Sequence, residues 1–115
     1  MFVNLDYHDS RPIYEQIADG FKKLILSGVM QTDEQMPSVR SLSMELSANP
    51  NTVQKAYSLL EKEGFIYTVR GRGNFVKGGK SLVEEKKQNI IEEIRKMLKE
   101  AESIGVSREE ILSEL

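Results

Sequence analysis

The stretch NPNTVQKAY, residues 49–57, carries polar side chains of the kind that recognise DNA. A glutamine amide both donates and accepts hydrogen bonds, and it can bond the edge of an adenine in the major groove. A lysine can neutralise a phosphate, and a helix that begins here presents free backbone N–H groups that also suit a phosphate. The residues of this stretch that we expect to contact DNA are Asn51, Thr52, Gln54 and Lys55.

Polar residues on a helix often face only solvent, so the surrounding chain has to decide between the two interpretations. The chain as a whole has a net charge of −2. Residues 37–80, however, hold 7 lysines and arginines against 3 acidic residues, whereas the segments on either side each carry an excess of acid. Positive charge gathered in the middle third favours a nucleic-acid partner.

Two short helices are expected to position this stretch. Ser38 follows a proline and is a good N-cap for a helix that ends near residue 47. Asn49 can cap the next helix, with Pro50 at its first position and Gly64 at its end. Two short helices separated by only a few residues predict a helix-turn-helix.

Arg40 lies in the first turn of the earlier helix, beside its cap. The first helix of a helix-turn-helix crosses the DNA backbone, so Arg40 is expected to contact a phosphate, while Ser38 caps the helix. A further helix is expected upstream, with Pro12 at its first position and Gly28 at its end.

The segment FIYTVRGRGNFV, residues 65–76, predicts a β-hairpin. Phe65, Tyr67 and Val69 alternate with Ile66, Thr68 and Arg70, and aromatic and β-branched residues dominate, as in a strand. Two glycines then supply a tight turn. The turn does not open a helix, which argues against a nucleotide-binding glycine loop. A helix-turn-helix followed by such a hairpin is a winged helix, whose tip we expect to meet the DNA through Arg70, Gly71, Arg72 and Gly73.

The tail after Gly79 predicts one long helix with an apolar seam at heptad spacing, interrupted at Lys87. A helix of about 23 residues is about 35 Å long, more than the preceding domain can readily cover, so pairing with a second copy is favoured over folding back. Gly105 ends this helix, and Ser107 with Glu110 predicts a capping box for a last short helix. The expected dimerisation residues are Val83, Ile90, Ile91, Ile94, Met97, Leu98, Ala101, Ile104, Ile111 and Leu112.

Other classes of protein lack support in this sequence. There is no cysteine, and the one histidine, His8, is expected at the surface, so neither a metal site nor a bound cofactor is expected. No catalytic arrangement of side chains stands out, so an enzyme is not expected. No apolar run approaches the length of a membrane span and no signal peptide is evident, which favours the cytoplasm.

Two segments, MPSVRSLS and NPNTVQKAYSLLEKEGFIYTVRGRGNFV, resemble the DNA-binding domain of GntR-type bacterial transcription regulators. The segment PIYEQIADGFKKLILSG resembles the first helix of that family, and the short tail resembles its YtrA-like subfamily, in which the tail mainly dimerises. The resemblance implies a winged-helix fold. It places near DNA the residues Ser38, Arg40, Thr52, Lys55, Gly71 and Gly73.

Together these observations predict a mainly α fold with a small β-hairpin wing. Residues 1–78 are expected to form a winged helix-turn-helix and residues 79–115 a helical dimerisation tail. The expected function is a homodimeric transcription regulator, more specifically a repressor, that binds an inverted-repeat operator in double-stranded DNA. The alternative is a winged-helix protein-interaction module that does not bind DNA. The tail leaves little room for a dedicated small-molecule effector pocket.

Overall fold

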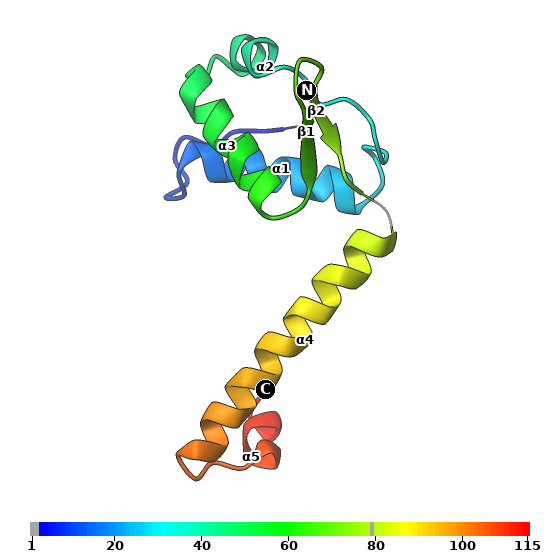
Figure 1. Cartoon of the computed structure of the whole chain (residues 1–115). Helices are drawn as coiled ribbons and strands as arrows, with labels where there is room; N and C mark the ends of the chain where they lie inside the picture. Colours follow the sequence, from blue (N-terminus) through cyan, green and yellow to red (C-terminus); the bar gives the residue numbers. More distant parts are fainter. Residues whose placement is uncertain (1–2, 79) are drawn as a thin grey trace. The chain divides into compact units, whose positions relative to one another are not determined.

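The structure is a computed structural model that describes residues 3–78 and 80–115 (Figure 1). The chain divides into two compact units, Met1–Leu82 and Val83–Leu115. Gly79, at which the second domain is expected to begin, lies outside the described residues. The first unit contains α1 (Ile13–Leu26), α2 (Val39–Leu46), α3 (Pro50–Lys62), β1 (Ile66–Val69) and β2 (Gly73–Val76).

The first helix starts one residue later than the sequence predicts. Pro12 has a non-helical ψ of 149°, so it stands immediately before α1 rather than in its first turn. Gly28 follows the last turn with a φ of +83°, a left-handed conformation that glycine adopts at little cost. The chain therefore leaves α1 where the sequence predicts.

The caps of the helix-turn-helix agree with the sequence prediction. The Ser38 hydroxyl accepts a hydrogen bond from the backbone N–H of Ser41 at 3.0 Å. The Asn49 side chain accepts one from the N–H of Asn51 at 2.8 Å, and α3 begins at Pro50. These bonds satisfy N–H groups that have no partner within a helix.

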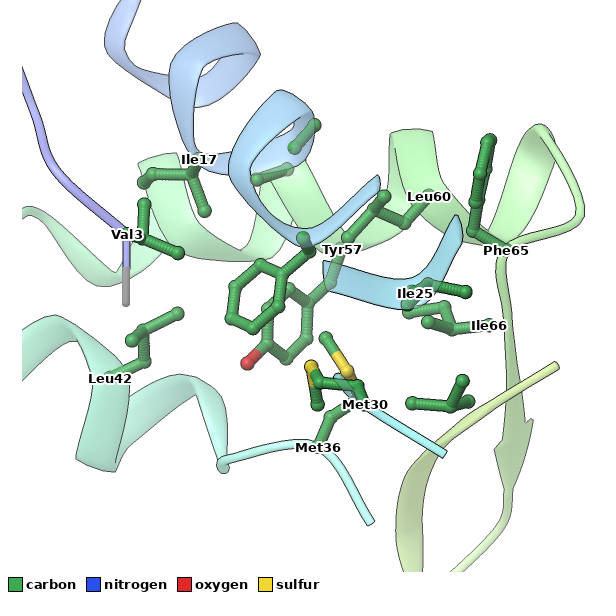
Figure 2. Close-up of a cluster of buried hydrophobic side chains, with 14 of the residues drawn as sticks. Val3, Ile17, Ile25, Met30, Met36, Leu42, Tyr57, Leu60, Phe65 and Ile66 are labelled. Atoms are coloured by element: carbon green, nitrogen blue, oxygen red, sulfur yellow. The ribbon is translucent and has the colours of Figure 1, made fainter. Parts of the chain in front are cut away.

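The core of the first unit lies between α1, α2, α3 and the hairpin (Figure 2). Phe21 of α1 and Tyr57 of α3 pack edge to face, with ring centroids 5.9 Å apart. The Tyr57 hydroxyl donates to the carbonyl oxygen of Pro37 at 2.7 Å, directly before the cap of α2. Tyr57 therefore joins all three helices. Other fully buried side chains are Ile17, Leu42, Val53, Leu60, Ile66 and Val76.

The two strands form the expected antiparallel hairpin, with Ile66 opposite Val76 and Val69 opposite Gly73. A segment between α1 and α2, for which the sequence pattern predicts no strand, pairs with the other side of β2. Gln35 forms a bridge with Phe75, and the N–H of Met36 donates to the carbonyl oxygen of Asn74 at 2.8 Å. The free side of β2 is thus covered by the loop that leads into α2.

The second unit consists of α4 (Lys80–Ser103), whose first residues belong to the first unit, and α5 (Arg108–Ser113). Gly105 has a φ of +84° after the end of α4. The Ser107 hydroxyl then accepts a hydrogen bond from the N–H of Glu110 at 3.1 Å and caps α5. The expected mainly α fold with a hairpin wing is confirmed. Within the described ranges, no helix is long and apolar enough to cross a membrane.

Candidate nucleic-acid interface

The α3 helix has one face buried in the core and one face exposed to solvent. Its buried face, formed by Val53, Ala56, Tyr57 and Leu60, belongs to the core. On the other face, Asn51, Gln54 and Lys55 are exposed and Thr52 is half-buried. None of the exposed side chains is needed for the core, so this face is free to contact a partner.

Gln54 and Lys55 are each held by a neighbour. The Gln54 amide donates to the hydroxyl of Ser58, one turn further along α3, at 3.2 Å. The ammonium of Lys55 lies 4.1 Å from the centre of the Tyr14 ring, which belongs to α1. A cation at this distance from the face of an aromatic ring is attracted to it. Tyr14 therefore belongs to this surface, although nothing in the local sequence pattern indicates that it would.

The start of α2 adds a second group of candidate residues. The backbone N–H of Ser41 occupies one lone pair of the Ser38 hydroxyl, whose own hydrogen can still be donated. Arg40 is exposed. Both residues can contact a phosphate without disturbing the cap.

The wing presents two exposed arginines, Arg70 and Arg72, at its turn. The N–H of Arg72 donates to the carbonyl oxygen of Val69 at 2.9 Å, and Gly71 between them has a φ of +78°. A turn of this kind requires a positive φ at that position, which explains the glycine.

The wing is attached to α3 by side chains as well as by the chain itself. The Thr68 hydroxyl of β1 donates to the carboxylate of Glu61 on α3 at 2.6 Å. In Figure 1 the turn of the wing, α2 and the start of α3 all lie at the same end of the first unit, the top as drawn. The fold therefore brings the three groups of predicted DNA-contacting residues to one end.

The apolar residues of the tail fall into two groups. Leu98 and Ala101 are buried within the single chain, and the N–H of Val106 donates to the carbonyl oxygen of Ala101 at 2.9 Å. Ile91 and Ile111 are half-buried. The others are largely exposed: Val83 by 48%, Ile90 by 58%, Ile94 by 48%, Met97 by 65%, Ile104 by 76% and Leu112 by 51%.

Side chains suited to other chemistry do not gather in the part of the chain that the structure describes. No group of three or more histidine, cysteine, aspartate or glutamate residues there is arranged to hold a metal ion. His8 is exposed, and its backbone N–H donates to the carboxylate of Asp6 at 2.9 Å.

A helix-turn-helix with a basic β-hairpin beside it defines a winged-helix DNA-binding domain. Residues 13–76 match the family described as bacterial regulatory proteins of the gntR family. The chain belongs to this family and is a DNA-binding transcription regulator. The expected resemblance is thus confirmed, and the alternative of a module without DNA binding is set aside. The family consists of regulators rather than enzymes.

Similar proteins support the assignment over nearly the full chain. The HTH-type transcriptional repressor YtrA of Bacillus subtilis is 42% identical over 111 residues, which cover 95% of this chain and 85% of the repressor. The structure of YtrA from Sulfolobus acidocaldarius, a GntR-family transcription factor, has a TM-score of 0.65 and 35% identity. It covers 82% of this chain and 97% of that one.

A third comparison includes DNA. The DNA-binding domain of AraR, solved in complex with its operator ORR3, is 27% identical and has a TM-score of 0.56. The match covers 64% of this chain and 88% of the AraR chain. A domain with the fold of the first unit therefore binds operator DNA in that structure.

Proposed function

We propose that this regulator is a homodimeric repressor that binds an inverted-repeat operator. The observation that carries the proposal is the row of exposed apolar side chains along α4. Val83, Ile90, Ile94 and Met97 of α4, and Ile104 directly after its end, follow one another at intervals of 7, 4, 3 and 7 residues. This is heptad spacing, and a soluble helix that exposes such a row needs a partner to cover it.

A second copy of the chain is the partner that this row fits best. Identical helices can pair through the same row, and most small oligomers are two-fold dimers. Leu98 and Ala101, which are covered within the chain, then stabilise the second unit rather than the pairing surface. Lys87 lies between Val83 and Ile90 in the row, where a polar residue can favour one register of the paired helices.

Each subunit of such a dimer brings one α3 helix and one wing to the DNA. In this proposal, Asn51, Thr52, Gln54 and Lys55 enter the major groove, and Ser38 and Arg40 contact the phosphate backbone. The wing tip, residues 70–73, lies against phosphates or the minor groove. Two-fold symmetry requires an inverted repeat, with half-site centres about 10 base pairs apart or a multiple of that distance. The site of action would be the cytoplasm, where the DNA lies.

Repression is proposed from the relative that is similar over most of its length, the YtrA repressor. A bound dimer that overlaps a promoter would block access of the polymerase. No separate activating domain is needed for that effect.

The test is selection of bound duplexes from a random pool with the full chain, combined with sedimentation of the free protein. We expect inverted repeats with the stated spacing and a dimer at micromolar concentration. Single half-sites or direct repeats, or a monomer at tens of micromolar, would contradict the proposal. In vitro transcription from a promoter that overlaps the selected site should then fall as the protein is added.

A further inference from the structure

The side chain of Gln35 lies against the tip of the wing. Its Nε2 donates to the carbonyl oxygen of Arg72 at 2.9 Å. The same atom lies 3.0 Å from the position that a Cβ at Gly73 would occupy. The amide of Gln35 therefore packs directly on the peptide that joins Arg72 to Gly73.

Backbone pairing explains how Gln35 reaches this position. Gln35 stands opposite Phe75, and on both sides of it backbone hydrogen bonds join its segment to β2. The N–H of Met36 donates to the carbonyl oxygen of Asn74 at 2.8 Å. The N–H of Val76 donates to the carbonyl oxygen of Glu34 at 2.9 Å. In an antiparallel pair, a long side chain also reaches the diagonal neighbour two residues away, which here is Gly73.

The tip of the wing is closed by the hydrogen bond from the N–H of Arg72 to the carbonyl oxygen of Val69, and the contact with Gln35 adds support from outside the hairpin. A two-stranded hairpin is marginally stable by itself. Gly71 and Gly73 both have positive φ values, +78° and +124°, and glycine leaves the backbone free to adopt other conformations. The direction in which Arg72 points depends on the peptide that Gln35 holds.

We propose that Gln35 is a positioning residue for DNA binding, which fixes the Arg72–Gly73 peptide so that Arg72 meets the DNA in a prepared orientation. The inference rests on the proposed contact between the wing and DNA. A tip that is ordered before binding loses less conformational freedom when the complex forms. Gln35 itself does not need to touch the DNA, and its effect acts through Arg72.

The test replaces Gln35 by methionine, which has a similar length but no N–H donor. Gln31→Met serves as the matched control, because Gln31 is an exposed glutamine in the same loop. On a duplex selected from the random pool, Gln35→Met should bind about twofold to tenfold more weakly, the loss expected for one hydrogen bond. Gln31→Met should bind normally, and both variants should keep the thermal unfolding midpoint of the unmodified protein.

A double-mutant cycle with Arg72→Ala separates positioning from a general structural effect. Once Arg72 is gone, Gln35→Met should cause no further loss of affinity. An equal loss in both backgrounds overturns the inference, as does an unchanged affinity of Gln35→Met when Arg72→Ala alone weakens binding. If Arg72→Ala alone is neutral, the proposed wing contact fails and the inference fails with it, which distinguishes the two failures.

Discussion

The ammonium of Lys55 lies 4.1 Å from the centre of the Tyr14 ring and therefore joins α3 to α1. Tyr14 is half-buried near the start of α1, and Lys55 is exposed on α3. The ring attracts the cation and restricts the otherwise flexible lysine. The surface proposed to read DNA thus includes a residue outside the helix-turn-helix and the wing.

Removing this ring should weaken binding evenly across DNA sequences. An exposed cation–π contact contributes about 0.5–1 kcal/mol, so Tyr14→Leu is expected to lower the affinity about twofold to fivefold. Titration of the selected operator and of its single-base variants measures this effect. Tyr7→Leu is the control, because it makes the same substitution at an exposed tyrosine of the same unit. Tighter binding by Tyr14→Leu would mean that the ring competes with DNA for the lysine.

Gln54 and Lys55 should behave differently when each is changed to alanine. A glutamine amide that bonds an adenine in a bidentate way contributes about 1–3 kcal/mol of discrimination, so Gln54→Ala should relax the preference at one base pair per half-site. Lys55→Ala should weaken binding to all sequences alike, because phosphate contacts carry no base information. Each variant is measured against a panel of single-base operator changes. If Gln54→Ala keeps every preference, Asn51 or the wing becomes the better candidate.

The salt dependence of DNA binding should show whether Arg40 and Arg72 contact phosphates. Each phosphate that a basic side chain neutralises contributes about 0.9 to the slope of log affinity against log salt concentration. Arg72→Ala and Arg40→Ala should therefore each flatten the slope by about 2 for a dimer, which carries two copies. The measurement is a titration at several salt concentrations. A slope that both variants leave unchanged would show that neither arginine contacts a phosphate.

Assembly should depend on the middle of the α4 row. Ile94→Asp places a carboxylate where two helices are proposed to meet, and a buried charge without a partner is strongly unfavourable. We expect monomers in sedimentation and loss of tight operator binding. Asn89→Asp adds the same charge at another exposed position of α4 and should remain dimeric. Dimers of Ile94→Asp as stable as those of the unmodified protein would contradict the proposed interface.

The hydrogen bond from the Tyr57 hydroxyl to the carbonyl oxygen of Pro37 should contribute measurably to the free energy of unfolding. Tyr57→Phe removes this bond, so the free energy of unfolding is expected to fall by about 1 kcal/mol. Burial raises the pKa of the Tyr57 hydroxyl well above that of an exposed tyrosine, which is about 10. Because the pKa is raised in the folded state, the hydroxyl contributes fully to stability below about pH 10 and progressively less above it. The difference in unfolding free energy between the unmodified protein and Tyr57→Phe should therefore shrink above about pH 10. Urea unfolding at pH 7 and at pH 10.5 measures both effects.

Local patterns made much of the fold predictable. Ser38 and Asn49 cap their helices through hydrogen bonds to residues two or three positions away, so the sequence around them was sufficient. The hairpin followed from alternating side chains and from the glycines of its turn. In each case the residues that decide the structure are close together in the sequence.

Contacts between distant segments could not be predicted in this way. Nothing near Gln35 indicates that its segment pairs with β2, and nothing near Tyr14 indicates that its ring meets Lys55. The tail shows the same limit. Its heptad pattern grouped Leu98 and Ala101 with Ile94, but periodicity alone does not separate an apolar residue covered within the chain from one that stays exposed.

The separation of α3 into a buried and an exposed face has a consequence for how such regulators diverge. Tyr57 and Leu60 are fixed by the core, whereas Asn51, Gln54 and Ser58 are exposed and can change at little cost to folding. With the proposed reading of DNA by α3, one scaffold can therefore acquire new operator sequences by substitutions on a single helix face. The same independence makes this face suitable for engineering, because libraries at those three positions should yield folded proteins with altered DNA preference.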